Sequence, residues 1–491
     1  MANKAMNLRS KLKDPNLLEC RAYVGGQWLN GDRGTFPVTN PVNNKKIADV
    51  SDLSREQIAQ VISQAELAQK DWAILTGKER AAILRNWFNL MIENADDLAM
   101  ILTIEQGKPL AEAKAEIHYG ASFIEFYSEE AKRIYGEIIP GHQQDKRISV
   151  IKQPIGVVAT ITPWNFPNAM ITRKIGPALA AGCTIVARPA SETPLSAIAL
   201  GVLAERAEIP KGVMNIVTSS RSSEVGEEFC THPAVRKLSF TGSTEVGRLL
   251  LRQAADKVLK CSMELGGNAP FIVFADADID AAVEGAMICK FRNNGQTCVC
   301  ANRLYIHESV YDTFAEKLTL AVNNLKVGDG LAPETTIGPM IHASAIHKVL
   351  EHLEDATIQG GKIMTGGAPH ELGGNFFQPT VLTEITQNMK VAHEETFGPL
   401  APLFKFKDEN EVIKRANSTI FGLAAYFYAR DVSLIQRVTE ALEYGIVGVN
   451  TGIISTEVAP FGGIKQSGLG REGSHHGIDD YLEMKYICLS V

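Results

Sequence analysis

The chain has 491 residues, which is enough for about three domains of ordinary size. Apolar residues make up 45% of it, so the sequence predicts a sizeable buried core and argues against an intrinsically disordered chain. Lysine and arginine number 49 and aspartate and glutamate 56, which gives a formal net charge of −7. This balance argues against a broad basic surface, and we expect no nucleic-acid partner.

Cysteine usage and the apolar runs narrow the class of protein further. Eight cysteines occur, and no two of them are spaced as Cys-x-x-Cys. The sequence therefore predicts neither a zinc site nor a disulfide framework, and we expect no bound metal. The first residues lack the apolar stretch of a secretory signal, and the longest nearly apolar run, 175–187, is too short to cross a bilayer. We expect a cytoplasmic protein without a membrane partner.

The N-terminal part of the chain is expected to be helical and to give way to alternating strands and helices. Over residues 54–135 apolar residues recur with the 3.6-residue period of a helix, for example at Ile58, Val61 and Ile62. From about residue 148 short β-branched runs alternate with helical segments, a pattern typical of a doubly wound parallel sheet. The predicted strands there are 149–151, 156–161, 183–187, 213–217 and 238–240, and the predicted helices are 171–181, 195–207 and 244–255.

A second alternating series begins near residue 269 and continues to about residue 470. It opens with strands at 269–274 and 304–306 on either side of a helix at 277–291. We therefore expect an α/β fold of two doubly wound units that meet near residues 264–267. Two segments fit neither unit, 132–150 and 471–491, and edge pieces of this kind often form a small β element at a subunit interface. They indicate a homo-oligomer, either a tetramer or a dimer.

Two glycine-rich segments are candidates for binding a phosphate. The first, 468–473, is a literal Gly-x-Gly-x-x-Gly, but no convincing strand precedes it, so we interpret its glycines as loop residues. The second, FTGSTEVG at 240–247, joins an apolar strand to an amphipathic helix, and backbone N–H groups at such a helix start bind phosphate. Arg248 stands where a P-loop would have lysine, and an ordinary capped turn remains the alternative.

Cys298 is the strongest candidate for a nucleophile in covalent catalysis. It lies in the polar segment FRNNGQTCVC at 291–300, where a loop would expose a thiolate nucleophile. Cys300 is interpreted as a packing residue, with a redox disulfide to Cys298 as a minority hypothesis. Glu264, beside two glycines, is a candidate base, and Asn165, between prolines and aromatic residues, is a candidate oxyanion donor. A solvated turn glutamate and an Asx-turn asparagine remain the alternatives.

Six motifs together resemble those of the NAD(P)-dependent aldehyde dehydrogenase superfamily, in the same order. They are PWNFP at 163–167, FTGSTEVG at 240–247, ELGG at 264–267, GQTC at 295–298, EETFGP at 394–399 and PFGG at 460–463. The resemblance implies that Cys298 is the nucleophile, Glu264 the base for water, and Asn165 with the Cys298 N–H the oxyanion hole. Lys174 stands where the family has a proton-relay lysine. The glutamate implies hydrolysis to a free acid rather than transfer of the acyl group to CoA.

The resemblance also assigns parts of the chain to the cofactor. It implies an NAD(P)-binding domain at 1–131 and 151–263, a catalytic domain at 264–470, and an oligomerisation element at 132–150 and 471–491. The family usually has lysine where Arg188 stands, and its NAD-specific members often have glutamate where Ser191 stands. An arginine beside a hydroxyl suits a 2′-phosphate, so we expect NADP, with NAD tolerated. The other expected cofactor residues are Pro163, Trp164, Gly226, Thr241, Gly242, Ser243, Leu265, Glu395 and Phe397.

Three positions bear on the substrate. Arg173, Arg292 and Ser455 stand where many members of the family have apolar or aromatic residues, and together they resemble the carboxylate clamp of succinate-semialdehyde dehydrogenases. Each arginine alone would more often be a solvated or salt-bridged surface residue. We expect oxidation of succinate semialdehyde to succinate, with glutarate semialdehyde as the alternative, because one methylene changes binding by only about 1–3 kcal/mol. A non-enzymatic descendant of the fold would be expected to lack Cys298 or Glu264, and both are present.

Overall fold

The computed structural model describes residues 8–491. One large sheet has eight strands in the order β19 (Gly468–Leu469), β11 (Lys260–Glu264), β10 (Val235–Thr241), β7 (Val157–Ile161), β8 (Thr184–Arg188), β9 (Met214–Ile216), β1 (Ala22–Val24) and β2 (Gln27–Leu29). The five strands from β11 to β9 run parallel, and antiparallel strands complete both edges. The parallel centre is what the alternation of strands and helices predicts.

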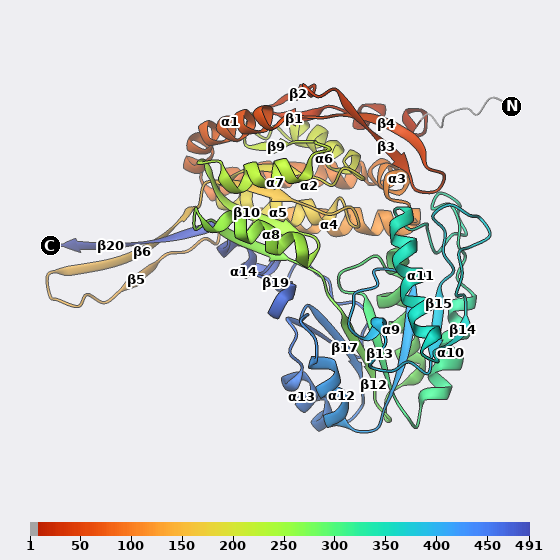
Figure 1. Cartoon of the computed structure of the whole chain (residues 1–491). Coiled ribbons are helices and arrows are strands. Elements are labelled where there is room, and N and C mark those ends of the chain that lie inside the picture. The colour runs from red at the N-terminus through yellow and green to blue at the C-terminus, as the bar shows by residue number, and fades with distance from the viewer. Residues whose placement is uncertain (1–7) are drawn as a thin grey trace.

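Helices cover both faces of this sheet (Figure 1). One side carries α1 (Arg55–Ile74), α7 (Ser222–Thr231) and α8 (Thr244–Ala255), and the other carries α2 (Gly77–Glu93), α3 (Ala95–Gln106), α4 (Leu110–Glu130), α5 (Ala169–Ala181) and α6 (Leu195–Arg206). Successive strand residues alternate between the two cores: Val157 and Ala159 belong to the first side and Val158 to the second. Both faces of the central strands are therefore buried, as a doubly wound sheet requires.

A second sheet of seven strands forms the other half of the molecule. Its order is β14 (Lys362–Thr365), β15 (Thr380–Thr383), β16 (Leu400–Phe406), β13 (Ala301–His307), β12 (Ala269–Val273), β17 (Ala424–Tyr428) and β18 (Ile446–Val449), all parallel except β14. One face packs on α9 (Ile279–Phe291) and α10 (Tyr311–Asn323), and the other on α11 (Ala343–Ile358), α12 (Glu409–Asn417) and α13 (Val432–Ala441). The fold class expected from the sequence, two doubly wound α/β units with a small β element, is confirmed.

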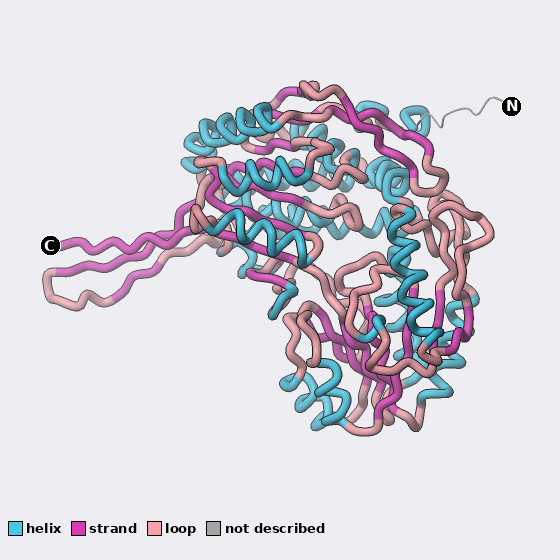
Figure 2. Tube along the Cα trace, in the orientation of Figure 1, coloured by secondary structure: helices cyan, strands magenta, loops and turns pink. Residues whose placement is uncertain are grey.

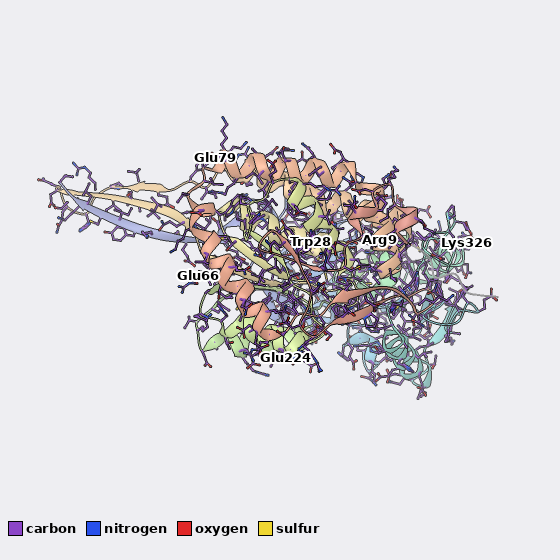
Figure 3. All side chains as sticks on the ribbon, turned by 90° about the horizontal axis from the view of Figure 1, so that it is seen from above. Arg9, Trp28, Glu66, Glu79, Glu224 and Lys326 are labelled. Atoms are coloured by element: carbon purple, nitrogen blue, oxygen red, sulfur yellow. The ribbon has the colours of Figure 1, made fainter. Side chains whose placement is uncertain are left out.

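The small β element is an arm of three antiparallel strands that projects from the body of the molecule. It consists of β5 (Glu137–Ile139), β6 (Lys146–Pro154) and β20 (Leu482–Ser490), and β20 pairs with β6 along its whole length. Figures 1 and 3 show it extending away from the body, with side chains directed outward on both sides. The shorter elements are a hairpin of β3 (Thr35–Asn40) and β4 (Lys45–Ser51), helix α14 (Ser474–Asp479), and the 3₁₀ turns η1 (Leu8–Lys11), η2 (Pro15–Leu17), η3 (Arg292–Gly295), η4 (Lys390–Ala392) and η5 (Lys465–Ser467).

Most of the predicted elements are present, with two differences. The helical stretch expected at 54–135 is four helices, α1 to α4, which Figure 2 shows as successive cyan coils, and α7 was not predicted. Residues 471–481, assigned with the tail to the oligomerisation element, lie outside the arm, because α14 packs against α4 and α5. The division into domains otherwise stays a prediction. No helix within residues 8–491 is long and apolar enough to cross a membrane.

Candidate active site

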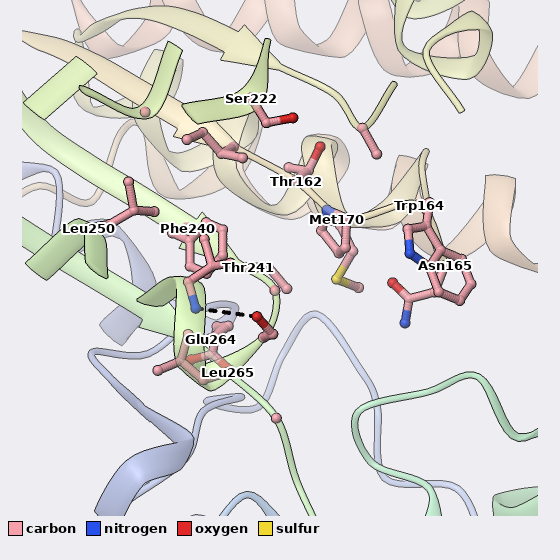
Figure 4. Close-up of a pocket in the computed structure, with 18 of the residues that line it drawn as sticks. Thr162, Trp164, Asn165, Met170, Ser222, Phe240, Thr241, Leu250, Glu264 and Leu265 are labelled. Carbon is pink, nitrogen blue, oxygen red and sulfur yellow. Dashed lines mark hydrogen bonds between the residues drawn. The ribbon is translucent and has the colours of Figure 1, made fainter. Parts of the chain in front are cut away.

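The carboxyl ends of β7, β8, β10 and β11 open into a cleft of about 600 Å³ (Figure 4). Ligands of open α/β sheets bind outside this edge, where strand ends converge. Asn165, Glu264 and Cys298 line the cleft together. Every residue expected to contact the cofactor lines it as well, namely Pro163, Trp164, Arg188, Ser191, Gly226, Thr241, Gly242, Ser243, Leu265, Glu395 and Phe397.

Buried polar atoms in this cleft test whether the residues present fit a dinucleotide. Arg188 Nε, Thr162 Oγ1 and Thr241 Oγ1 are buried and have no hydrogen-bond partner among residues 8–491. Buried polar groups are normally paired, so these atoms indicate a polar ligand. Arg188 Nη2 donates to the Ser219 carbonyl (3.1 Å) and the Ser222 hydroxyl (2.6 Å), which fixes the guanidinium in the cleft wall. The cleft therefore fits a ligand with several hydroxyl and phosphate groups.

A carboxylate that the sequence interpretation overlooked lies at the Ser191 end of the cleft. Ser191 Oγ donates to Glu192 Oε2 (3.2 Å), and both residues line the cleft with Arg188. The hydroxyl that was expected to receive a 2′-phosphate is therefore bonded to an anion, and an anion repels a phosphate. This contact weakens the expected preference for NADP over NAD.

The loop that presents Cys298 has a strained backbone. Three successive residues of η3 have left-handed φ angles: Asn293 (50°), Asn294 (58°) and Gly295 (72°). Asparagine and glycine adopt this conformation at the least cost, and a Cβ on Gly295 would lie 2.3 Å from the Gly398 carbonyl oxygen. Burial raises the pKa of the Cys298 thiol to about 12, so the thiol needs a base before it can react as a thiolate.

Asn165 is held by hydrogen bonds that also involve the Cys298 loop. Its Nδ2 donates to the Gln296 carbonyl (3.1 Å), which leaves a second amide hydrogen for a ligand. The backbone carbonyl of Asn165 accepts hydrogen bonds from Lys108 Nζ (2.8 Å) and Asn293 Nδ2 (2.9 Å). Lys108 in turn pairs with Glu116 at 2.6 Å, and both side chains are buried. Because Asn293 belongs to the Cys298 loop, these hydrogen bonds fix the amide relative to the thiol loop.

Glu264 ends β11 as a buried carboxylate. Neither of its oxygens has a hydrogen-bond partner among the residues that the structure describes. Gly462 makes room for it, because a Cβ there would lie 2.9 Å from Glu264 Oε1. Burial raises the pKa of Glu264 well above its usual value, Glu472 adds to this effect, and Arg173 opposes it. An unpaired carboxylate with a raised pKa, in the same cleft as a thiol, is suited to accept a proton.

Arg173 and Lys174 are neighbours on α5 and both bind Glu472. Arg173 Nη2 lies 2.6 Å from Glu472 Oε2, while Lys174 Nζ pairs with Glu472 Oε1 and donates to Ser239 Oγ (3.1 Å). Although burial opposes it, these two cations hold the pKa of Glu472 below its usual value. Arg173, which the sequence interpretation assigned to the substrate, therefore already has an anionic partner within the protein. Its Nε is buried without a hydrogen-bond partner among the described residues, and the assignment of Arg173 to the substrate stays a prediction.

A second cavity, of about 210 Å³, adjoins Cys298. The three residues expected to contact the substrate, Arg173, Arg292 and Ser455, all line it. The Arg292 guanidinium lies 5.4 Å from the centre of the Phe166 ring, and its side chain makes no hydrogen bond to another residue within 8–491. A cation without a hydrogen-bond acceptor, in a small cavity that reaches the thiol, suits an anionic group on the substrate.

Sequence reasoning missed Glu472, which pairs with Arg173 of the second cavity, and Tyr119, which lines that cavity. Glu472 lies between Gly470 and Gly473, in the segment interpreted as loop glycines, and this acid between turn glycines was the available signal. Tyr119 lines the second cavity from α4, and no local signal distinguishes it from other helical residues. Cys300 is buried, and Lys290 Nζ donates to its sulfur at 3.3 Å. The disulfide hypothesis for Cys300 stays a prediction.

Comparisons with known proteins agree with this site. The model of the aldehyde dehydrogenase family matches residues 28–487. The chain is 63% identical over 482 residues to succinate-semialdehyde dehydrogenase (NADP+) GabD of Escherichia coli, covering 98% of this chain and 100% of that protein. It is 62% identical over 480 residues to a glutarate-semialdehyde dehydrogenase of Pseudomonas aeruginosa, with coverage of 98% and 99%. The crystal structure of an E. coli NADP-dependent enzyme, 62% identical, superposes with a TM-score of 0.97 over 98% of this chain and 100% of that one. The chain belongs to the aldehyde dehydrogenase family, which confirms the resemblance of the six motifs.

Proposed function

We propose that this protein oxidises succinate semialdehyde to succinate, with NADP or NAD, through a covalent intermediate on Cys298. The observation that carries the proposal is the 210 Å³ cavity that brings Cys298, the free guanidinium of Arg292 and Ser455 together. A nucleophile and a cation in one small cavity suit a short aldehyde with a carboxylate tail. Similarity to succinate- and glutarate-semialdehyde dehydrogenases supports the same class of substrate.

The first half of the reaction forms a thioester on Cys298. Glu264 takes the thiol proton, and the thiolate sulfur bonds to the aldehyde carbon. The second amide hydrogen of Asn165 and the backbone N–H of Cys298 donate to the oxygen as it becomes an oxyanion. A nicotinamide held in the large cleft would supply the oxidation, as the acceptor of the hydride that the carbon loses.

The second half releases the acid. Glu264 first releases the thiol proton toward solvent. It then takes a proton from a water molecule, the hydroxide oxygen bonds to the thioester carbon, and the Cys298 sulfur leaves as the thiolate, which recovers its proton from Glu264. Lys174 and Glu472, paired deeper in the protein, offer a path for the surplus proton. The cations of Arg173 and Lys174 lower the pKa of Glu264 against the effect of burial, which favours the ionised base needed for this step.

The cofactor would lie along the large cleft. We propose that Arg188 and Ser191 face the adenosine ribose, that Ser243, at the N-terminus of α8, faces the phosphates, and that Glu395 holds the nicotinamide ribose. Glu395 is fixed by a hydrogen bond that its Oε1 accepts from the Gly267 N–H (3.1 Å). We propose NADP as the preferred cofactor, with NAD accepted, because Arg188 favours a 2′-phosphate whereas Glu192 opposes it.

Glutarate semialdehyde is the second candidate substrate. It differs from succinate semialdehyde by one methylene, which is worth only about 1–3 kcal/mol in a pocket. A glutarate-semialdehyde dehydrogenase at 62% identity supports it nearly as strongly as the succinate enzyme at 63% supports the first candidate. A purely structural role is disfavoured, since Cys298, Glu264 and Asn165 line one cleft.

The test is a panel of kcat/KM values for semialdehydes of three to six carbons and for neutral aldehydes of equal length, each with NADP and NAD. We expect a maximum at the four- or five-carbon semialdehyde and much lower values for the neutral aldehydes. A preference for neutral aldehydes would overturn the proposed substrate class. Turnover without loss in Cys298→Ala would overturn the proposed chemistry.

We further propose that the arm of β5, β6 and β20 docks on a second copy of this chain. It exposes apolar side chains at Ile138 (87%), Met484 (73%), Tyr486 (59%) and Leu489 (57%). A ribbon of three strands without a core of its own is marginal in water, and exposed apolar patches mark contacts between proteins. Light scattering should give a molar mass at least twice the 53.4 kDa of one chain. The double variant Met484→Lys, Leu489→Lys should dissociate into monomers. An unchanged mass for that variant would contradict the proposal.

A further inference from the structure

Tyr119 places a hydroxyl group in the substrate cavity. It lies on the face of α4 that lines this cavity, together with Glu112, Ala115 and Glu116, at the spacing of one helical face. Its ring packs edge-on against Phe123, with the ring centres 5.0 Å apart. The hydroxyl oxygen is buried and has no hydrogen-bond partner among residues 8–491. An orphaned polar atom in a cavity indicates that a ligand completes it.

The groups around this hydroxyl are mainly donors. Arg173 and Arg292 lower the pKa of Tyr119, and Ser455 lies near enough to do the same, but burial outweighs them and raises it. The phenol therefore keeps its proton at neutral pH and is available as a donor. Guanidinium groups offer no acceptor, and the two carboxylates of the cavity wall, Glu112 and Glu116, already accept hydrogen bonds from the Asn293 and Asn168 N–H groups. A carboxylate supplies up to four acceptor positions and completes the set.

The two arginines are not equivalent in this respect. Arg173 is paired with Glu472 at 2.6 Å and is bound on its other face by the Phe461 ring, 4.1 Å from the guanidinium carbon. Arg292 has only the Phe166 ring contact and no side-chain hydrogen bond within the described chain. Arg292 and Tyr119 therefore have no anionic partner within 4 Å in the described chain, and Arg173 still has a buried Nε without a hydrogen-bond partner.

We infer that Tyr119 is a specificity-determining residue whose hydroxyl donates to the carboxylate tail of the substrate, next to the charge supplied by Arg292. The inference rests on the proposed function and refines it, because it adds Tyr119 to the residues expected to bind the carboxylate. Arg173 lines the same cavity and also acts on the chemistry through Glu472. An aldehyde without an anionic tail leaves the Tyr119 hydroxyl unpaired and gains nothing from it.

The experiment compares Tyr119→Phe with the wild type on succinate semialdehyde and on butanal, which has the same number of carbons. The substitution removes only the hydroxyl oxygen and keeps the ring on Phe123. A hydrogen bond to a charged group is worth roughly 10- to 100-fold, so kcat/KM for the semialdehyde should fall by about that factor, mainly through KM. The value for butanal should change by less than about twofold. Calorimetric binding of succinate to the ligand-free protein should weaken by a similar factor, independently of turnover.

Tyr127→Phe is the matched control on the same helix. Tyr127 donates to the Ser474 carbonyl (3.1 Å) outside the cavity, so its loss should leave the ratio of the two substrates unchanged. Equal losses on both substrates in Tyr119→Phe, or unchanged succinate binding, would overturn the role of Tyr119 while the proposed function stands. A wild type that prefers butanal would overturn both.

Discussion

Arg173 and Glu472 face each other at 2.6 Å with both side chains almost fully buried, between the substrate cavity and the buried amine of Lys174. The same carboxylate thus neutralises an arginine that lines the substrate cavity and holds the lysine expected to move protons. Both cations also act on Glu264, whose pKa they lower against the effect of burial. In the proposed mechanism, the pair therefore links the cavity for the substrate with the base that activates water.

Arg173→Gln should alter the pH dependence of the reaction. Without this cation the pKa of Glu264 rises further, so the rising limb of the kcat profile moves to higher pH, and kcat at neutral pH falls by roughly tenfold. Steady-state rates of both variants across the accessible pH range measure this. Arg292→Gln is the control, and its rising limb should stay in place. A limb that does not move in Arg173→Gln would show that the arginine does not act on Glu264.

Glu264→Gln should separate the two halves of the reaction. The first turnover slows because the thiol has lost its base, but it still produces about one equivalent of reduced cofactor per active site, after which the thioester persists. Rapid-mixing absorbance measures the burst, and intact-protein mass spectrometry detects the acyl group on Cys298. Absence of both the burst and the acyl adduct would mean that Glu264 serves hydride transfer and not hydrolysis.

Lys108→Met should reduce both stability and rate. It leaves Glu116 as an uncompensated buried charge, which costs about 3–5 kcal/mol in the free energy of unfolding, and removes the 2.8 Å hydrogen bond to the Asn165 carbonyl. The double variant Lys108→Met with Glu116→Gln should recover part of the stability, while kcat stays about 10- to 100-fold low because the Asn165 loop is no longer fixed. Urea unfolding and kcat measure the two effects separately. Full recovery of kcat in the double variant would assign Lys108 to folding alone.

Glu192→Gln should raise the preference for NADP over NAD. The exposed carboxylate repels a 2′-phosphate, and removing such an interaction at a solvated site changes the ratio of kcat/KM values by about two- to fivefold. Ser191→Glu, which adds a second carboxylate, should move the ratio toward NAD. If neither substitution changes the ratio, residues outside 188–192 determine cofactor choice.

The parts of the site that were predictable from the sequence are those whose signal is local. Cys298, Glu264 and Asn165 each lie in a short motif at the end of a strand or in a polar loop, and the sheet edge then brings these motifs into one cleft. Tyr119 was not predictable and Glu472 had only the weak signal of an acid between turn glycines, because the roles of both come from contacts distant in sequence. Lys174 and Glu472, for example, are 298 residues apart.

The elements of the fold were likewise predictable where their sequence signal is local. Alternating β-branched runs and periodic helices identified the two sheets, whereas α7 was missed because it has only two large apolar side chains, Val225 and Phe229, and its other buried positions include a glycine and a glutamate. The length of the arm was not predictable either, since its apolar residues face outward instead of marking a core.

The most direct measurement is the ratio of kcat/KM for succinate semialdehyde to that for butanal, in the wild type and in Arg292→Gln. Arg292 is the cation of the substrate cavity whose side chain has no hydrogen bond within residues 8–491. If it binds the carboxylate tail, the ratio should be large in the wild type and fall roughly 10- to 150-fold in the variant, with butanal itself little affected. A ratio that is the same in both proteins would contradict recognition of an anionic semialdehyde at this site.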